Sequence, residues 1–215
     1  DEIALGTQSQ PELTQQFGGA VPDAALQAYI ADIGKRMAAT TEADNPSLPW
    51  EFTLLNSDVI NAFALPGGKI FFSKGLAVEM TNEAQVAAVV GHEIGHVTAR
   101  HTNDRYAQVM GAQIGIGVAG ILLDGTSTAA ALPVGKQLLD LAIMRYGREQ
   151  ELEADELGMR YMTRVGYDPV GAIEVQEILA RASGDGAPPE FLSTHPSAET
   201  RLKDLFDEQL ADFGK

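Results

Sequence analysis

Apolar residues recur at helical spacing in two segments of the first half of the chain. In residues 23–39 an apolar side chain returns every three or four positions, which is the period of a helix with one buried face. The residues expected on that face are Leu26, Tyr29, Ile30, Ile33 and Met37. The same period returns in residues 82–97, where Asn82 and Gln85 form a capping-box signature. The pattern therefore predicts two amphipathic helices, the second of which begins after Asn82.

Between these helices, residues 50–73 have the pattern of strands. Apolar and polar residues alternate in 50–55, and residues 69–72 are rich in β-branched and aromatic side chains. Pro66, Gly67 and Gly68 form a turn before the second of these segments. We expect a small antiparallel sheet here, and therefore a mostly helical α+β fold.

A third helical pattern covers roughly residues 135–165 and contains an acidic run from Glu149 to Glu156. Glu151 and Asp155 are four residues apart, so they share one face of this helix. We interpret Glu149, Glu153 and Glu156 as solvated surface charges.

The segment His92-Glu93-Ile94-Gly95-His96 has the spacing of a zinc site. Two histidines four residues apart lie about 40° from each other on a helix, so both imidazoles can reach one metal ion. Glu93 is then placed beside a metal-bound water rather than on the metal. The pattern predicts a metal-dependent hydrolase with His92 and His96 as ligands.

Two glycines interrupt the same predicted helix. Gly91 and Gly95 are four residues apart, and each lowers helix stability by about 1 kcal/mol relative to alanine. We expect another chain segment to approach this face closely, because a glycine leaves room for a neighbouring backbone.

Catalytic zinc has three protein ligands, so one more must come from elsewhere. A longer zinc motif, with a third histidine six residues after the second, would need a histidine at position 102 and a glycine at 99, but the chain has Thr102 and Ala99. His101 lies on the opposite side of a continuous helix from His92, and we expect it to be solvated. On spacing alone, Glu151 is a candidate for the third ligand.

Four blocks make the chain resemble peptidase family M48, a family of gluzincin zinc metallopeptidases with membrane and soluble periplasmic members. They are residues 61–68 (NAFALPGG), 92–96 (HEIGH), 151–155 (ELEAD) and 193–197 (STHPS). The resemblance covers nearly the whole chain and implies a zincin-like fold, with the sheet over the HEIGH helix. It implies that Glu151 is the third zinc ligand and that Asp155 orients a zinc histidine. Arg148 stands where such sequences place an arginine, although Gly147 replaces a common serine.

The resemblance also implies roles for two other segments. An exposed edge strand at Asn61, Ala62, Phe63 and Ala64 would bind an extended peptide by main-chain hydrogen bonds. On the residues alone, a plain core hairpin is the favoured interpretation of this segment. His195, in an expected loop, would donate to the oxyanion of the reaction or become a fourth zinc ligand that shuts the enzyme off. A solvent-exposed histidine is the remaining alternative.

Length and composition narrow the class of protein. With 215 residues the chain is expected to form one metallopeptidase domain, residues 1–215. Its net charge of −15 argues against nucleic acid and anionic membrane surfaces as partners. The absence of cysteine excludes disulfide bonds and cysteine zinc sites, and is compatible with a bacterial periplasmic protein. Residues 1–6 do not resemble a signal peptide, so we expect any signal or lipoprotein segment to lie outside this sequence.

Residues 109–123 form a glycine-rich apolar stretch of 15 residues. A membrane-spanning helix needs about 20 residues, so no transmembrane segment is expected here. We interpret the stretch as a flap or a buried connector near the active site, with peripheral membrane contact as an alternative.

Together these features predict a zinc-dependent endopeptidase with one Zn²⁺ per chain and Glu93 as its general base. The expected location is the periplasm or cell envelope of a bacterium, and the expected substrates are unfolded or extended polypeptides, such as misfolded envelope proteins. One alternative is a zinc hydrolase that acts on non-peptide substrates. The other is an autoinhibited or chaperone-like envelope assembly factor whose zinc site is plugged, with His195 as the candidate plug.

Overall fold

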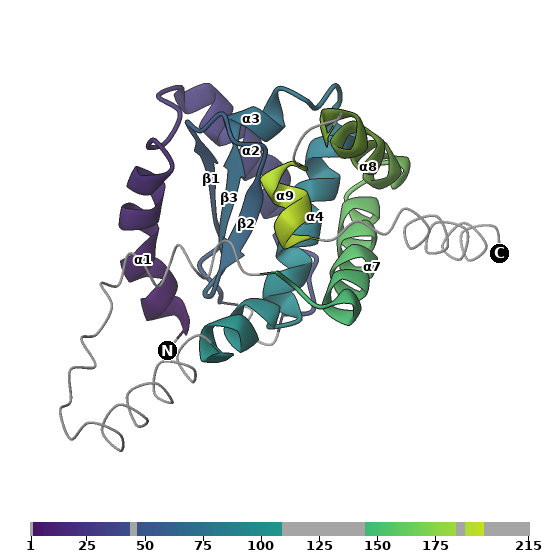
Figure 1. Ribbon diagram of the computed structural model, residues 1–215. Helices are drawn as coiled ribbons and strands as arrows, with labels where there is room; N and C mark the ends of the chain where they lie inside the picture. Colours follow the sequence, from purple (N-terminus) through teal and green to yellow (C-terminus); the bar gives the residue numbers. More distant parts are fainter. Residues whose placement is uncertain (1, 44–46, 109–144, 184–187, 196–215) are drawn as a thin grey trace, which may run out of the picture.

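The computed structural model describes residues 2–43, 47–108, 145–183 and 188–195, and shows a mostly helical α+β fold (Figure 1). The mostly helical fold class is therefore confirmed. The strands are β1 (Glu51–Leu55), β2 (Ala62–Leu65) and β3 (Lys69–Ser73). The helices are α1 (Glu2–Gln16), α2 (Ala24–Ala38), α3 (Lys74–Ala77), α4 (Glu83–Thr98), α7 (Arg148–Arg164), α8 (Val170–Ser183) and α9 (Glu190–Thr194). Residues 101–108 are also helical.

The sheet is mixed, with strand order β1-β3-β2. β2 and β3 pair antiparallel, as predicted, but β1 and β3 pair parallel, so the prediction of a purely antiparallel sheet was wrong. The chain reverses direction twice between β1 and β3, and β3 then lies between the two earlier strands. The second reversal is the tight turn at Gly67 and Gly68, whose φ angles of 80° and 78° favour glycine. β2 is left at an edge of this sheet.

The two faces of the sheet belong to two clusters of buried apolar side chains. Ile70 and Phe72 of β3 face the larger cluster, which includes residues of α2 and α4. Phe71, between them in the sequence, faces the smaller cluster, with Leu13 of α1 and Phe63 of β2. This alternation follows the two-residue period of a strand. Helices therefore cover both faces, with α1 on one side and α2 and α4 on the other (Figure 1).

Helix α2 begins where the sequence predicts, but its buried face is shorter than expected. Asp23 is the N-cap, and its carboxylate accepts hydrogen bonds from the backbone N–H groups of Ala25 and Leu26. Burial starts at Ile30, so Leu26 and Tyr29 are 47% and 41% exposed and were wrongly placed inward. The first half of the helix has the apolar period, but no neighbouring element covers it in the described part of the chain.

Asn82 caps α4, as predicted. Its side-chain oxygen accepts a hydrogen bond of 3.0 Å from the backbone N–H of Gln85. The reciprocal bond of a capping box is absent, because the Gln85 side chain accepts from the backbone N–H of Thr81 and donates to Glu174 of α8. These bonds tie the start of α4 to α8, which packs against it.

Helices α4 and α7 lie side by side and in close contact (Figure 1). A Cβ atom added to Gly95 would lie 2.7 Å from the carbonyl oxygen of Ala154, and one added to Gly91 would lie 3.0 Å from that of Gly158. The prediction of a close backbone approach at these two glycines is therefore confirmed. The segment that approaches is α7, which carries Glu151 and Asp155.

Three predictions concern residues outside the described part of the chain. They are the flap or connector at 109–123, the beginning of the third helical pattern at 135–144, and the residues after His195. Within the described part, the same helical pattern was wrong at residues 145–147, which are not helical, since α7 begins at Arg148 after the N-cap Gly147. Among the described residues, no helix is long and apolar enough to cross a membrane.

Candidate metal centre and active site

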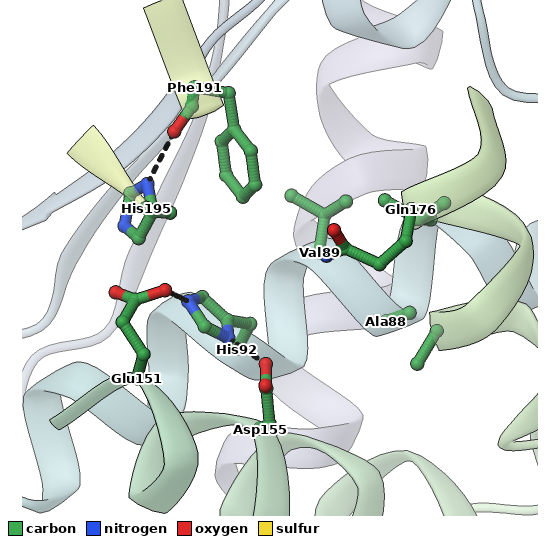
Figure 2. Close-up of a pocket in the computed structure, with 10 residues that line it drawn as sticks. Ala88, Val89, His92, Glu151, Asp155, Gln176, Phe191 and His195 are labelled. Carbon is green, nitrogen blue, oxygen red and sulfur yellow. Dashed lines mark hydrogen bonds and ion pairs between the residues drawn. The ribbon is translucent and has the colours of Figure 1, made fainter. Parts of the chain in front are cut away.

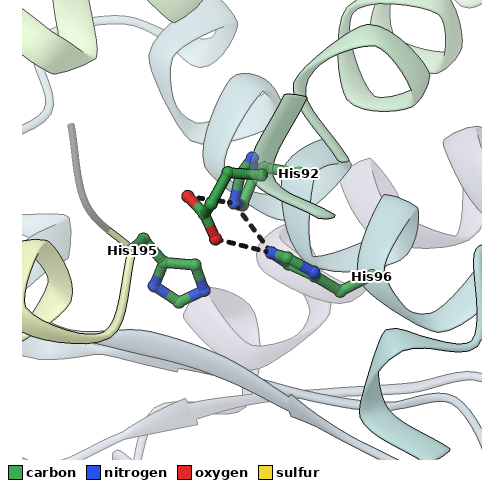
Figure 3. A group of neighbouring side chains, drawn as sticks. His92, His96 and His195 are labelled. Atoms are coloured by element: carbon green, nitrogen blue, oxygen red, sulfur yellow. Dashed lines mark hydrogen bonds and ion pairs between the residues drawn. The ribbon is translucent and has the colours of Figure 1, made fainter. Parts of the chain in front are cut away.

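His92 and His96 project from one face of α4, as the spacing predicts, and both are buried. Their Nε2 atoms lie 3.0 Å apart. Glu151 of α7 completes the group, because its carboxylate oxygens lie 3.3 Å from Nε2 of His96 and 3.8 Å from Nε2 of His92. Figure 3 shows the two imidazoles pointing toward each other, and Figure 2 shows the carboxylate of Glu151 beside His92.

These three side chains fit a zinc ion. Ligand atoms about 2.0–2.1 Å from a tetrahedral zinc ion are separated from one another by roughly 3.3 Å. The separations of 3.0, 3.3 and 3.8 Å lie on either side of that value. Two imidazole nitrogens and one carboxylate also form a ligand set that catalytic zinc uses.

Asp155 lies one helical turn after Glu151 and is close to the other nitrogen of His92. The Oδ1–Nδ1 distance is 2.8 Å, so the His92 Nδ1–H donates to the carboxylate, and the lone pair of Nε2 faces a metal once the proton on this nitrogen is lost. Burial by itself would lower the pKa of His92, but the carboxylates of Asp155, Glu151 and Glu93 together outweigh it and raise this pKa to about 9, with the largest contribution from Asp155. Burial and the neighbouring His92 keep the pKa of His96 well below its usual value, so His96 is neutral.

His101 is buried, so the prediction of a solvated histidine was wrong. Its Nδ1 lies 3.0 Å from Nδ1 of His96, and its Nε2 lies 3.2 Å from a carboxylate oxygen of Glu153. The prediction assumed a continuous helix, but Arg100 has φ 63° and turns the chain after α4. Glu153 was interpreted as a solvated charge and is partly exposed, but it also binds His101.

Glu93 is fully buried behind the two histidines. Neither of its carboxylate oxygens has a hydrogen-bond partner among the described residues. Burial raises the pKa of Glu93 to about 7, although the neighbouring His92 opposes the shift. A carboxylate with a pKa near neutrality can both accept and release a proton, which is what a general base in hydrolysis must do.

His195 follows α9 directly and is buried, so the solvent-exposed alternative is wrong. Its Nε2 lies 3.4 Å from Oε1 of Glu93, and its ring stacks on Phe191. One ligand atom from each of His92, His96, Glu151 and His195 can be chosen so that all four lie within 4.8 Å of one another. Figure 3 shows His195 on the opposite side of this group from α4. Both remaining roles, oxyanion donor and fourth ligand, are compatible with this position.

Two residues that the sequence did not single out also belong to the site. The ring of Tyr146 stacks on His96 at 3.6 Å between centroids, and the guanidinium of Arg105 lies 3.9 Å from the centre of the Tyr146 ring. Both side chains are buried, and burial raises the pKa of Tyr146. No periodicity or spacing marks either residue, because their neighbours come from other segments.

A small pocket opens beside His92. Its lining combines apolar side chains of α4, α8 and α9 with Gln176 and with four residues of the metal site, His92, Glu151, Asp155 and His195 (Figure 2). The apolar lining includes Ala88, Val89, Ala172, Val175 and Phe191. The side-chain oxygen of Gln176 is buried without a hydrogen-bond partner among the described residues. Figure 2 shows it reaching from α8 toward Val89.

The predicted substrate strand lies next to the site as an edge strand. Ala62, Phe63 and Ala64 belong to β2, which packs against α4, and their side chains are buried. Asn61 precedes the strand and donates a side-chain hydrogen bond of 2.8 Å to Glu190 of α9. Among the described strands β2 is an edge, but its residues are buried and it forms a hairpin with β3, as the alternative of a core hairpin expects. Peptide binding there stays a prediction.

Comparison with known proteins decides the family. The sequence pattern of Peptidase family M48 matches residues 24–209. The chain belongs to this family. The membership confirms the resemblance drawn from the four sequence blocks, and the mostly helical structure with its small sheet agrees with a zincin-like family M48 fold.

Several curated members of family M48 are similar to the chain. It is 35% identical over 175 residues to the mitochondrial metalloendopeptidase OMA1 of Arabidopsis thaliana, covering 79% of this chain and 33% of that protein. It is 33% identical over 201 residues to the beta-barrel assembly-enhancing protease of Escherichia coli K12, covering 88% of this chain and 41% of that protein. It is 30% identical over 180 residues to the mitochondrial metalloendopeptidase OMA1 of Schizosaccharomyces pombe, covering 82% of this chain and 51% of that protein. The chain thus spans about a third to a half of the length of these relatives.

Proposed function

We propose that the chain is a zinc-dependent endopeptidase domain formed by residues 1–215. The observation that carries the proposal is the convergence of His92, His96 and Glu151 on one buried point, with the carboxylate of Glu93 close by. Membership of a peptidase family supports hydrolysis of peptide bonds over hydrolysis of other substrates. One Zn²⁺ per chain would be held by the three ligands, with Asp155 orienting His92.

Glu93 would carry the proton transfers of the reaction. When bound, zinc supplies an activated water molecule and polarises the peptide carbonyl. Glu93 would accept a proton as the water attacks and would pass it to the leaving amine. Its burial supports this role, because a carboxylate in an apolar environment holds a proton more readily than one in water.

Polypeptide substrates would bind along β2 in extended form. The strand is an edge, and main-chain hydrogen bonds to Asn61, Ala62, Phe63 and Ala64 would align a peptide without reading much of its sequence. A side chain next to the cleaved bond would enter the pocket beside His92. The apolar walls of that pocket favour a small apolar residue, and Gln176 adds one hydrogen-bond acceptor at its side.

His195 has two candidate roles. Its Nε2 would donate to the oxyanion of the reaction, or it would bind zinc as a fourth ligand and hold the domain inactive. The second role has a specific observation behind it, because a ring nitrogen of His195 already lies within 4.8 Å of the three ligand atoms. It would make the domain a peptidase that is switched on when His195 moves away.

The bacterial cell envelope, most simply the periplasm, is the proposed location. The protease names of bacterial relatives refer to beta-barrel assembly, and beta-barrel proteins are envelope proteins in bacteria. We propose that misfolded or unassembled envelope proteins are the substrates. The mitochondrial relatives show that family membership alone does not define the compartment. The proposal includes peripheral association with a membrane, and it does not include nucleic acid as a partner.

Zinc content and cleavage of unfolded casein test this function in four proteins. Wild type should bind one zinc ion and cleave casein, while Glu93→Gln should keep zinc and lose about a hundredfold or more of the rate. His92→Ala should lose zinc, and Glu156→Gln, an exposed change on α7, should behave as wild type. A Glu93→Gln protein that cleaves at the wild-type rate would overturn the mechanism.

His195→Ala separates the two roles of that histidine. Faster cleavage by this variant identifies a gate, and slower cleavage with normal zinc content identifies an oxyanion donor. If wild type binds zinc but neither protein cleaves casein, the endopeptidase proposal fails in favour of a binding role.

A further inference from the structure

We propose that His101, held by Glu153, is a positioning residue for His96, in the same way that Asp155 orients His92. The two zinc histidines would then each have their own hydrogen-bond partner, both of which are supplied or anchored by α7. The inference rests on the metal site of the proposed function and not on peptidase activity.

The contact between His96 and His101 determines where the protons lie. Their Nδ1 atoms are 3.0 Å apart, and two ring nitrogens at this distance can share one proton. For His96 to bind a metal through Nε2, its Nδ1 must carry the hydrogen and donate it. His101 must therefore accept at Nδ1, and its own proton is on Nε2.

Glu153 supports this arrangement from the far side of His101. Its carboxylate lies 3.2 Å from Nε2 of His101 and accepts the proton that this tautomer places there. The hydrogen bonds then run in one direction, from His96 to His101 to Glu153. The reverse direction would put a proton on Nε2 of His96 and block its lone pair.

The backbone is bent at the residue that makes the contact possible. On a continuous helix, His101 would lie about 140° around the axis from His96, because the two residues are five positions apart. Instead, Arg100 adopts φ 63°, as the one non-glycine residue with positive φ in the described part of the chain. This conformation costs a non-glycine residue about 1 kcal/mol, and the bend brings the ring of His101 back to His96.

The burial of His101 and Glu153 predicts how much each contributes to holding the proton of His96 on Nδ1. The side chain of His101 is 5% exposed, whereas that of Glu153 is 58% exposed. Water can replace Glu153 as the acceptor for His101, but it has little access to the space between the two rings. Tyr146 already restrains the plane of the His96 ring by stacking, so the specific contribution of His101 is the tautomer of His96.

The affinity for Zn²⁺, measured by competition with a chelator on the whole chain, tests the proposal. His101→Leu should weaken binding about tenfold to a hundredfold, as loss of a hydrogen-bond partner of a metal ligand does elsewhere. His101→Asn should restore most of the affinity, because its side-chain oxygen can occupy the place of Nδ1. Glu153→Gln should lose only about threefold, since the carboxylate is exposed.

Glu156→Gln is the matched control, with the same charge change on an exposed position of α7. The unfolding temperature of the metal-free proteins separates positioning from folding: affinity lost without a matching loss of stability supports the proposal. Equal affinity of His101→Leu and wild type would overturn it, as would equal weakness of the Leu and Asn variants. Absence of zinc binding by wild type would instead refute the proposed function.

Spectra of ¹⁵N-labelled histidines in the zinc-loaded wild type give a second test that needs no variant to fold. The proposal requires a protonated Nε2 and an unprotonated Nδ1 in His101. The opposite tautomer of His101 would overturn it.

Discussion

Gly95→Ala should destabilise the protein, although the same change stabilises most helices. Replacing a glycine by alanine inside a helix normally contributes about 1 kcal/mol of stability. Here the added Cβ would lie 2.7 Å from the carbonyl oxygen of Ala154 and 3.0 Å from its Cα. Both atoms belong to the backbone of α7, so the contact can be relieved only if α4 and α7 move apart by several tenths of an ångström.

The expected magnitude follows from these two opposing effects. Overpacking of a well-packed contact costs about 1–3 kcal/mol, which exceeds the gain in helix propensity. The net loss of about 1 kcal/mol corresponds to a decrease of roughly 2–4 °C in the unfolding temperature. Glu151 lies on α7, whereas His92 and His96 lie on α4, so the movement also separates this carboxylate from the two histidines. Zinc affinity should therefore fall by about tenfold.

Thermal unfolding of the metal-free protein and zinc competition measure the two effects separately. Gly91→Ala is the matched control, because its nearest backbone atom is 3.0 Å away and the next is 3.3 Å away. It should be close to neutral in both measurements. An increase in the unfolding temperature of Gly95→Ala, with wild-type zinc affinity, would show that the two helices are not in the contact described.

Three further changes test other parts of the structure. Asp155→Asn should keep the fold but weaken zinc binding about tenfold, since a neutral amide polarises His92 less; unchanged affinity in chelator competition would contradict this. Asn82→Ala should lower the free energy of unfolding by about 1 kcal/mol in urea denaturation, because α4 loses its N-cap; an equally stable variant would refute the assigned cap. Gln176→Leu should shift cleavage of a peptide library toward aliphatic over polar residues beside the cleaved bond, because the pocket loses a buried hydrogen-bond acceptor; an unchanged preference would remove Gln176 from the substrate pocket.

Local sequence patterns were sufficient for α2, α4 and the centre of the metal site, but they did not predict α1 or α8. The period of apolar residues placed the start of α2 correctly, and this period together with the cap Asn82 placed the start of α4. These signals are local, because a helix is built from hydrogen bonds and side-chain contacts between residues three or four apart. The same period put His92 and His96 on one face. Gly95 indicated a close neighbour, although nothing in its surroundings identified that neighbour as α7.

The tertiary structure decided everything that depends on which distant segments meet. β1 pairs parallel with β3, because β3 lies between β1 and β2 in the sheet. The order of the three strands along the chain does not specify which of them are neighbours. His195 reaches the metal centre only because α9 packs beside it. His101 was misplaced because a single left-handed residue, Arg100, redirects the chain, and an arginine carries no local signal for that conformation. The sequence by itself determined the helix period and the spacing of the ligands. Packing between segments, which local periodicity does not encode, determined which side chains surround them.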